Sequence, residues 1–126
     1  MTHSKSNFIA ISACFGFFGV VLGAFGAHGL KNILSPDLMT VYHTGVLYHL
    51  IHTIALLGFG IIHRHYAGVQ WPGWCFSAGI IVFSGSLYLL AITGIKLLGA
   101  ITPIGGLLLL CGWLGLFLGS YRHYKK

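Results

Sequence analysis

The chain has 126 residues, of which 56% are hydrophobic and only 6% are charged. Soluble domains carry about 25% charged residues, so this sequence has too few polar side chains to cover a surface in water. Seven Lys and Arg residues against one acid give a formal charge of +6, and the high hydrophobicity excludes a disordered chain. These exclusions leave an integral membrane protein, in which each membrane span takes about 20 residues.

Four apolar stretches follow one another along the chain, covering residues 7–27, 38–62, 73–94 and 103–119. Each approaches or exceeds the length needed to cross a hydrocarbon core of about 30 Å. Because a helix satisfies its own backbone hydrogen bonds in lipid, the sequence predicts an all-α, single-domain integral membrane bundle of four transmembrane helices. The first stretch is too long for the apolar region of a cleaved signal, so we expect it to be retained.

The second and fourth helices are preceded by typical start signals. Ser35-Pro36-Asp37 combines a capping hydroxyl, a proline at the first helical position and an acid facing the positive helix end. Thr102-Pro103 repeats the cap-and-proline arrangement, and Pro72 is expected to open the third helix.

The distribution of basic residues predicts the orientation in the membrane. With four spans, both termini and the connection between the second and third helices share one side. That side carries Lys5, Arg64, Arg122, Lys125 and Lys126, whereas the other carries Lys31 and Lys96. Because cytoplasmic loops are enriched in Lys and Arg, we predict a multi-pass protein of the bacterial inner membrane with both termini in the cytoplasm.

Glycine recurs on one face of the first helix and on one face of the fourth. The glycines are Gly16, Gly19, Gly23 and Gly26 in the first helix and Gly105, Gly112, Gly115 and Gly119 in the fourth. Such faces let helices approach closely in lipid. Two uses stay open at this point: packing of the first helix on the fourth, or a seam between copies of the chain.

The second span contains an unusual number of polar side chains, and His49 and His52 fall near its middle. An ionisable side chain at that depth suggests a functional site. We define a candidate polar cavity by His28, Tyr48, His49, His52, Ser84 and Tyr88. The alternative is that neutral imidazoles hydrogen-bond to tyrosine or serine hydroxyls and lock the second helix to the third.

A second candidate site, for an anion or a lipid phosphate, lies on the outer rim, where the second and fourth helices begin and their positive dipole ends point. Its residues are Lys31, Ser35, Lys96 and Thr102. The alternative is that both lysines only extend to water. On the cytoplasmic rim, Arg122, Lys125 and Lys126 are expected to attract anionic lipids.

No residue pattern typical of catalysis stands out. The sequence has no CxxC or HExxH motif, and its one carboxylate, Asp37, precedes the second apolar stretch. We therefore expect no catalytic residue, no metal and no cofactor. Cys14, Cys75 and Cys111 are interpreted as reduced packing residues. No nucleic-acid partner is expected, since no soluble module presents the basic charge.

Four ordered motifs carry a family resemblance. They are Gly23–Leu30 (GAFGAHGL), Tyr48–Leu57 (YHLIHTIALL), Phe83–Tyr88 (FSGSLY), and Ile101–Gly106 (ITPIGG) followed by Gly112-Trp113. Together they resemble the small bacterial inner-membrane proteins typified by YgdD and YwdK, a family of unknown function. The resemblance covers nearly the whole chain and implies four membrane helices without established catalytic residues. It implies glutamine at the position of His49, whereas His28 and His52 match the pattern.

These observations predict a non-enzymatic membrane protein that packs as a homo-oligomer or as an accessory subunit of a larger membrane assembly. The alternative is a small transporter, a channel or a lipid- or quinone-binding protein that uses the polar cavity. The expected partners are membrane lipids and either further copies of the chain or another membrane protein.

Overall fold

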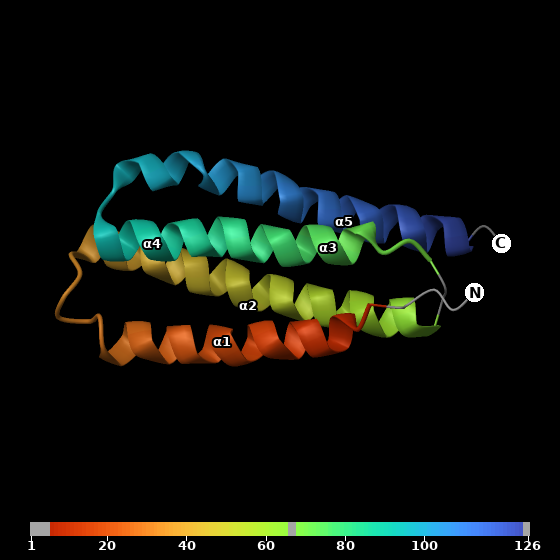
Figure 1. The fold of residues 1–126 in the computed structure, drawn as a ribbon, viewed down its shortest axis with the longest axis horizontal. Helices are drawn as coiled ribbons and strands as arrows, with labels where there is room; N and C mark the ends of the chain where they lie inside the picture. The colour runs from red at the N-terminus through yellow and green to blue at the C-terminus, as the bar shows by residue number, and fades with distance from the viewer. Residues whose placement is uncertain (1–5, 66–67, 125–126) are drawn as a thin grey trace.

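The computed structural model describes residues 6–65 and 68–124, and every regular element in that part of the chain is helical (Figure 1). Four of its helical stretches are long and apolar enough to cross a membrane, which confirms the predicted fold class. The elements are α1 (Phe8–His28), α2 (Pro36–His65), α3 (Trp71–Gly79), η1 (Ile80–Ser84), α4 (Gly85–Thr93), η2 (Lys96–Ala100) and α5 (Thr102–Tyr124). The third span runs through α3, η1 and α4, and η1 is a single π-helical turn within it.

The second span is the longest. α2 contains 30 residues, which corresponds to about 45 Å at 1.5 Å per residue and exceeds a hydrocarbon core of about 30 Å. Its ends therefore stand in the headgroup region, or the helix tilts.

The predicted helix starts are confirmed in two places and wrong in one. Pro36 is the first residue of α2, where the Ser35 hydroxyl accepts a hydrogen bond from the Leu38 N–H at 3.3 Å. Pro72 lies in the first turn of α3, as its second residue after Trp71. Thr102 does not act as a cap. It is the first residue of α5, and its hydroxyl lies 2.7 Å from the Ser86 hydroxyl, so it joins α5 to α4 instead.

The four spans lie side by side in one row, with α1 and α5 at opposite edges and α2 and the third span between them (Figure 1). Consecutive spans run in opposite directions. The starts of α1 and α3 therefore lie at the same end of the bundle as the last residues of α2 and α5. The edge spans are the least covered by the rest of the protein. In the most apolar 18-residue segment of each span, 17% and 22% of the residues are buried in the edge spans, against 39% and 44% in the two middle spans.

The glycine face of α1 packs on α2. A Cβ atom at Gly19 would fall 2.6 Å from the Leu50 side chain, and one at Gly26 would overlap the Tyr42 ring. A methyl group at Gly19 would require the Leu50 side chain to move, and one at Gly26 would require the buried Tyr42 ring to move. The absence of side chains at these positions is therefore what allows α1 and α2 to approach this closely.

The glycine face of α5 packs on the third span. A Cβ atom at Gly112 would come within 2.7 Å of the Phe76 ring, and one at Gly105 would overlap the Phe83 backbone. The expected packing of the first helix on the fourth is therefore wrong. Each glycine face contacts the span next to it in sequence, because short connections place consecutive helices side by side.

The buried apolar residues form two clusters, separated along α2 by a polar segment. One cluster, towards the end where α2 finishes, contains Phe8, Leu56, Phe59, Phe76, Ile80 and Leu109. The other, towards the start of α2, contains Leu30, Tyr42 and Ala91. His49 and His52 lie between them in the α2 sequence and are both buried.

Replacing Gly105 by alanine tests the contact between α5 and the third span. The methyl group would overlap the Phe83 backbone, which cannot swing aside as a side-chain tip can. We expect the free energy of unfolding to fall by about 1–3 kcal/mol, measured by circular dichroism in detergent micelles. Gly119→Ala is the matched control, because its methyl group would meet nothing within 4 Å in the same helix. Equal losses in both variants would contradict the assigned contact.

Candidate functional site

His49 connects three helices. Its Nε2 lies 2.7 Å from the Phe15 carbonyl oxygen of α1, and its Nδ1 lies 2.9 Å from the Tyr88 hydroxyl of α4. A carbonyl oxygen can only accept a hydrogen bond, so Nε2 carries the proton. In the neutral ring Nδ1 then accepts from the Tyr88 hydroxyl, and both ring nitrogens are satisfied.

His52 makes the corresponding connection to α5. The Trp113 indole N–H donates to His52 Nε2 at 3.0 Å, and His52 Nδ1 lies 2.8 Å from the Tyr48 carbonyl oxygen. An indole nitrogen can only donate, so Nε2 accepts and Nδ1 carries the proton. His52 is therefore a neutral imidazole, and its tautomer is opposite to that of His49.

These bonds leave neither imidazole with a spare lone pair in its neutral form. The bond from His49 to Tyr88 is the kind of lock that the sequence suggested, while the bonds to Phe15 and Trp113 extend it to α1 and α5. Within residues 6–65 and 68–124, no three His, Cys, Asp or Glu side chains gather where they could hold a metal ion. The arrangement is suited to joining helices.

Tyr48 and His52 also line a groove of about 580 Å³ between α2 and α5. Its floor and walls include Phe83, Leu107 and Trp113. The Leu107 side chain is exposed, so the groove is open on the outside of the bundle. Its lining is mostly apolar.

The structure does not bring the six predicted cavity residues together. The Ser84 hydroxyl donates to the Gly45 carbonyl oxygen at 2.7 Å and is buried between η1 and α2. The Tyr88 hydroxyl is hydrogen-bonded to His49 at the contact between α4 and α2. Tyr48 and His52, in contrast, line the groove. His28 is the last residue of α1 and is exposed.

The four residues of the predicted outer-rim site have separate surroundings. Lys31 and Lys96 are exposed on different connections. The Ser35 hydroxyl caps α2, and the Thr102 hydroxyl bonds to α4. Both hydroxyls are thus already engaged, and an anion site there stays a prediction that depends on the two lysines.

On the opposite rim Arg122 is exposed, whereas Lys5, Lys125 and Lys126 lie outside the described residues. All three cysteines are free. Cys14 and Cys111 are exposed on the two edge helices, so their interpretation as packing residues is wrong.

The sequence analysis predicted no role for Trp113, which forms a hydrogen bond in the site. A tryptophan in the middle of a span was the available signal, because tryptophan in membrane proteins is concentrated at the two interfaces. A central tryptophan is expected to use its N–H within the protein, and here His52 accepts it.

Four apolar helices in a row, joined by hydrogen bonds between their buried polar groups, define a small multi-span α-helical membrane protein. The family model described as "Protein of unknown function (DUF423)" matches residues 22–106. The chain belongs to this family, and the resemblance drawn from its motifs is confirmed.

Three relatives illustrate the similarity, and each is named only as a UPF0382 membrane protein. One from Staphylococcus saprophyticus is 46% identical over 116 residues, which cover 91% of this chain and 97% of the relative. YwdK of Bacillus subtilis is 40% identical over 119 residues, covering 92% and 97%. A Haemophilus influenzae protein is 40% identical over 121 residues, covering 94% and 96%. No solved structure matches the chain.

Replacing His49 separates the hydrogen-bonding role from simple bulk. We expect His49→Leu to lower the free energy of unfolding by about 1–2 kcal/mol, since it removes two interhelical bonds within the membrane. His49→Gln should lose less, because an amide can donate to the Phe15 carbonyl and accept from the Tyr88 hydroxyl. Tryptophan fluorescence during unfolding by sodium dodecyl sulfate measures both.

His43→Leu is the control, because His43 is an exposed histidine of the same helix. If His49→Gln and His49→Leu were equally destabilising, the assigned pair of hydrogen bonds would be wrong.

Proposed function

We propose that this chain is a non-enzymatic protein of the bacterial inner membrane that works as a homo-oligomer or as an accessory subunit of a membrane assembly. The observation that carries this proposal is the open row of helices, in which both edge spans are largely uncovered. Along α1, Cys14, Phe18, Val21 and Phe25 recur at positions i, i+4, i+7 and i+11 and are all exposed. They share one face of the helix, and that face is available to a neighbouring helix.

The state of the polar groups supports a role without catalysis. A membrane enzyme needs a nucleophile with a base, or a metal. The ring nitrogens of His49 and His52 are instead engaged in hydrogen bonds, three of which join α2 to other helices. The transporter or channel alternative has less support, because the groove beside Tyr48 is mostly apolar and lies on the bundle surface. Such a groove favours a lipid chain over a hydrated path.

The proposal includes an orientation with both termini in the cytoplasm. Five of the seven basic residues belong to the side of the termini, and Lys31 and Lys96 belong to the other. This asymmetry follows the positive-inside rule.

Oxidative cross-linking through the native cysteines tests the packing role. In a background with Cys75→Ser, two variants keep a single thiol, either Cys14 on α1 or Cys111 on α5. Both thiols are exposed, so copper-phenanthroline in native membranes should join two copies if that edge forms the interface. We expect a covalent dimer from the Cys14 variant, or a larger mixed product if α1 contacts a different protein.

The variant without cysteines is the control for non-specific products. Native mass spectrometry in mild detergent gives an independent measure of the assembly. The packing role is overturned if neither edge yields a cross-linked product and the purified protein is a monomer without a co-purifying partner.

Labelling from outside the cell tests the orientation. Lys31→Cys and Arg122→Cys place single thiols at exposed positions on opposite rims of the cysteine-free chain. In spheroplasts, a membrane-impermeant maleimide should label the thiol at position 31 at once and the thiol at position 122 only after permeabilisation. The reverse pattern would place the termini outside.

A further inference from the structure

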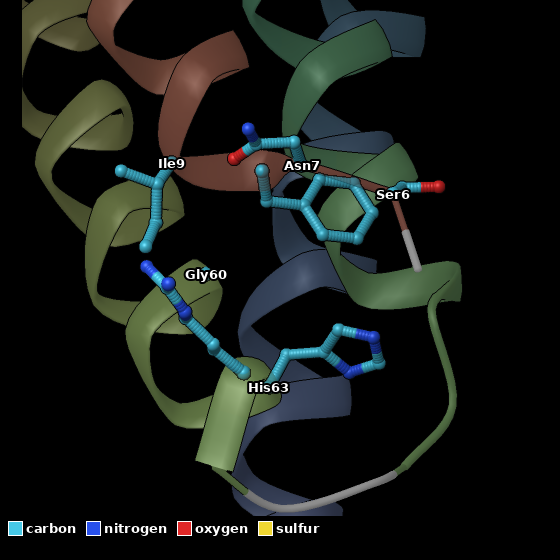
Figure 2. A pocket seen from close by; sticks show the side chains of 7 residues that line it. Ser6, Asn7, Ile9, Gly60 and His63 are labelled. Carbon is cyan, nitrogen blue, oxygen red and sulfur yellow. The ribbon is translucent and has the colours of Figure 1, made fainter. Parts of the chain in front are cut away.

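A second pocket lies where the first span begins and the second span ends. It is lined by residues 6–9 at the start of α1 and by Gly60, His63 and Arg64 near the end of α2, and its volume is about 290 Å³. Figure 2 shows Ile9 close to Gly60, with Asn7 and His63 on opposite sides of them. We call it the terminal pocket. Ligand sites for drug-sized molecules occupy about 300–1,000 Å³, so this pocket suits a compact group.

Arg64 gives the terminal pocket a positive charge that no acidic side chain of the protein can balance. The single acid of the chain is Asp37, which lies in the first turn of α2. The two residues are 64 − 37 = 27 positions apart in one helix, or about 40 Å at 1.5 Å per residue. Arg64 is exposed, so an anion from outside the chain can reach a guanidinium that no acidic side chain of the protein neutralises.

The side chains around Arg64 add donors to the pocket. The Asn7 Oδ1 accepts from the Ala10 N–H at 3.1 Å as the cap of α1. Asn7 lines the pocket, and this bond leaves its amide NH₂ group as a donor of two further hydrogen bonds. The Ser6 hydroxyl donates to Gln70 Oε1 at 2.6 Å and holds the start of α1 against the start of α3. The pocket thus offers a guanidinium and an amide, both of which suit an oxyanion.

The position of the pocket identifies the kind of oxyanion. It lies at the ends of two candidate membrane spans, and Phe8 and Ile9 form an apolar part of its wall. The ends of spans are where lipid headgroups are expected. We propose that the terminal pocket binds the phosphate of an anionic phospholipid, with Arg64 as the charged ligand and Asn7 as a second donor. Guanidinium groups pair well with phosphate because two N–H groups can bond to two oxygens in parallel.

Lipid binding to the purified full-length protein tests this assignment. Native mass spectrometry in detergent counts bound phosphatidylglycerol, with net-neutral phosphatidylethanolamine as the comparison lipid. We expect Arg64→Gln to weaken phosphatidylglycerol binding at least about tenfold, because it removes the charge that strengthens both guanidinium hydrogen bonds. Arg122→Gln is the matched control, because Arg122 is an exposed arginine of the same rim that does not line the pocket.

Asn7→Asp provides a second variant that preserves the fold. Aspartate caps helices as well as asparagine does, but its negative charge at the pocket would repel a phosphate. We expect unchanged thermal stability together with weaker binding of phosphatidylglycerol. This variant removes the objection that a loss of binding reflects misfolding.

Three outcomes would overturn the proposal. Equal losses in Arg64→Gln and Arg122→Gln would show a diffuse attraction of charges and no site. Unchanged lipid binding in both Arg64→Gln and Asn7→Asp would show that the terminal pocket is not used. Displacement of phosphatidylglycerol by millimolar inorganic phosphate would assign the pocket to free phosphate, whereas retention of the lipid supports the assignment.

Discussion

Burial of apolar surface cannot hold this fold together once it is in the membrane, because lipid tails are as apolar as leucine. Two other interactions replace it. Glycine lets α1 approach α2 and lets α5 approach the third span until side chains meet backbone. Hydrogen bonds from two central imidazoles then join the helices, at about 0.6 kcal/mol each for an average interhelical bond in a membrane. The row of helices depends on this combination of close contact and hydrogen bonding.

The spans were predictable from the sequence because the driving interaction is local. Each helix must be apolar over the thickness of the bilayer and must satisfy its own backbone, and both properties can be read from a continuous stretch of residues. The start of α2 at Pro36 was also predictable, since a cap and a proline act within one turn. The π-helical turn η1 was not predicted. It lies where the Phe83 backbone contacts Gly105, and that contact depends on a different helix.

The partners of the helix faces could not be deduced in the same way. A glycine stripe shows that a close contact exists, but it does not name the opposite surface, and here the nearest span in sequence provides it. The polar residues illustrate the same limit. The spacing of His49 and His52 suggested one shared cavity, yet their side chains turn to different neighbours, Tyr88 and Trp113. Thr102 likewise bonds across to Ser86 although its position suggested a cap.

The two imidazoles bond to different helices, and this has a mechanical consequence for α2. A rotation of this helix about its axis would pull His49 away from α1 and α4 and, at the same time, His52 away from Trp113. These hydrogen bonds therefore restrain the rotation of α2 about its own axis. Because α2 is also longer than the hydrocarbon core is thick, tilting is its available response to a change in membrane thickness. Its hydrogen bonds to α1, α4 and α5 would incline those helices with it.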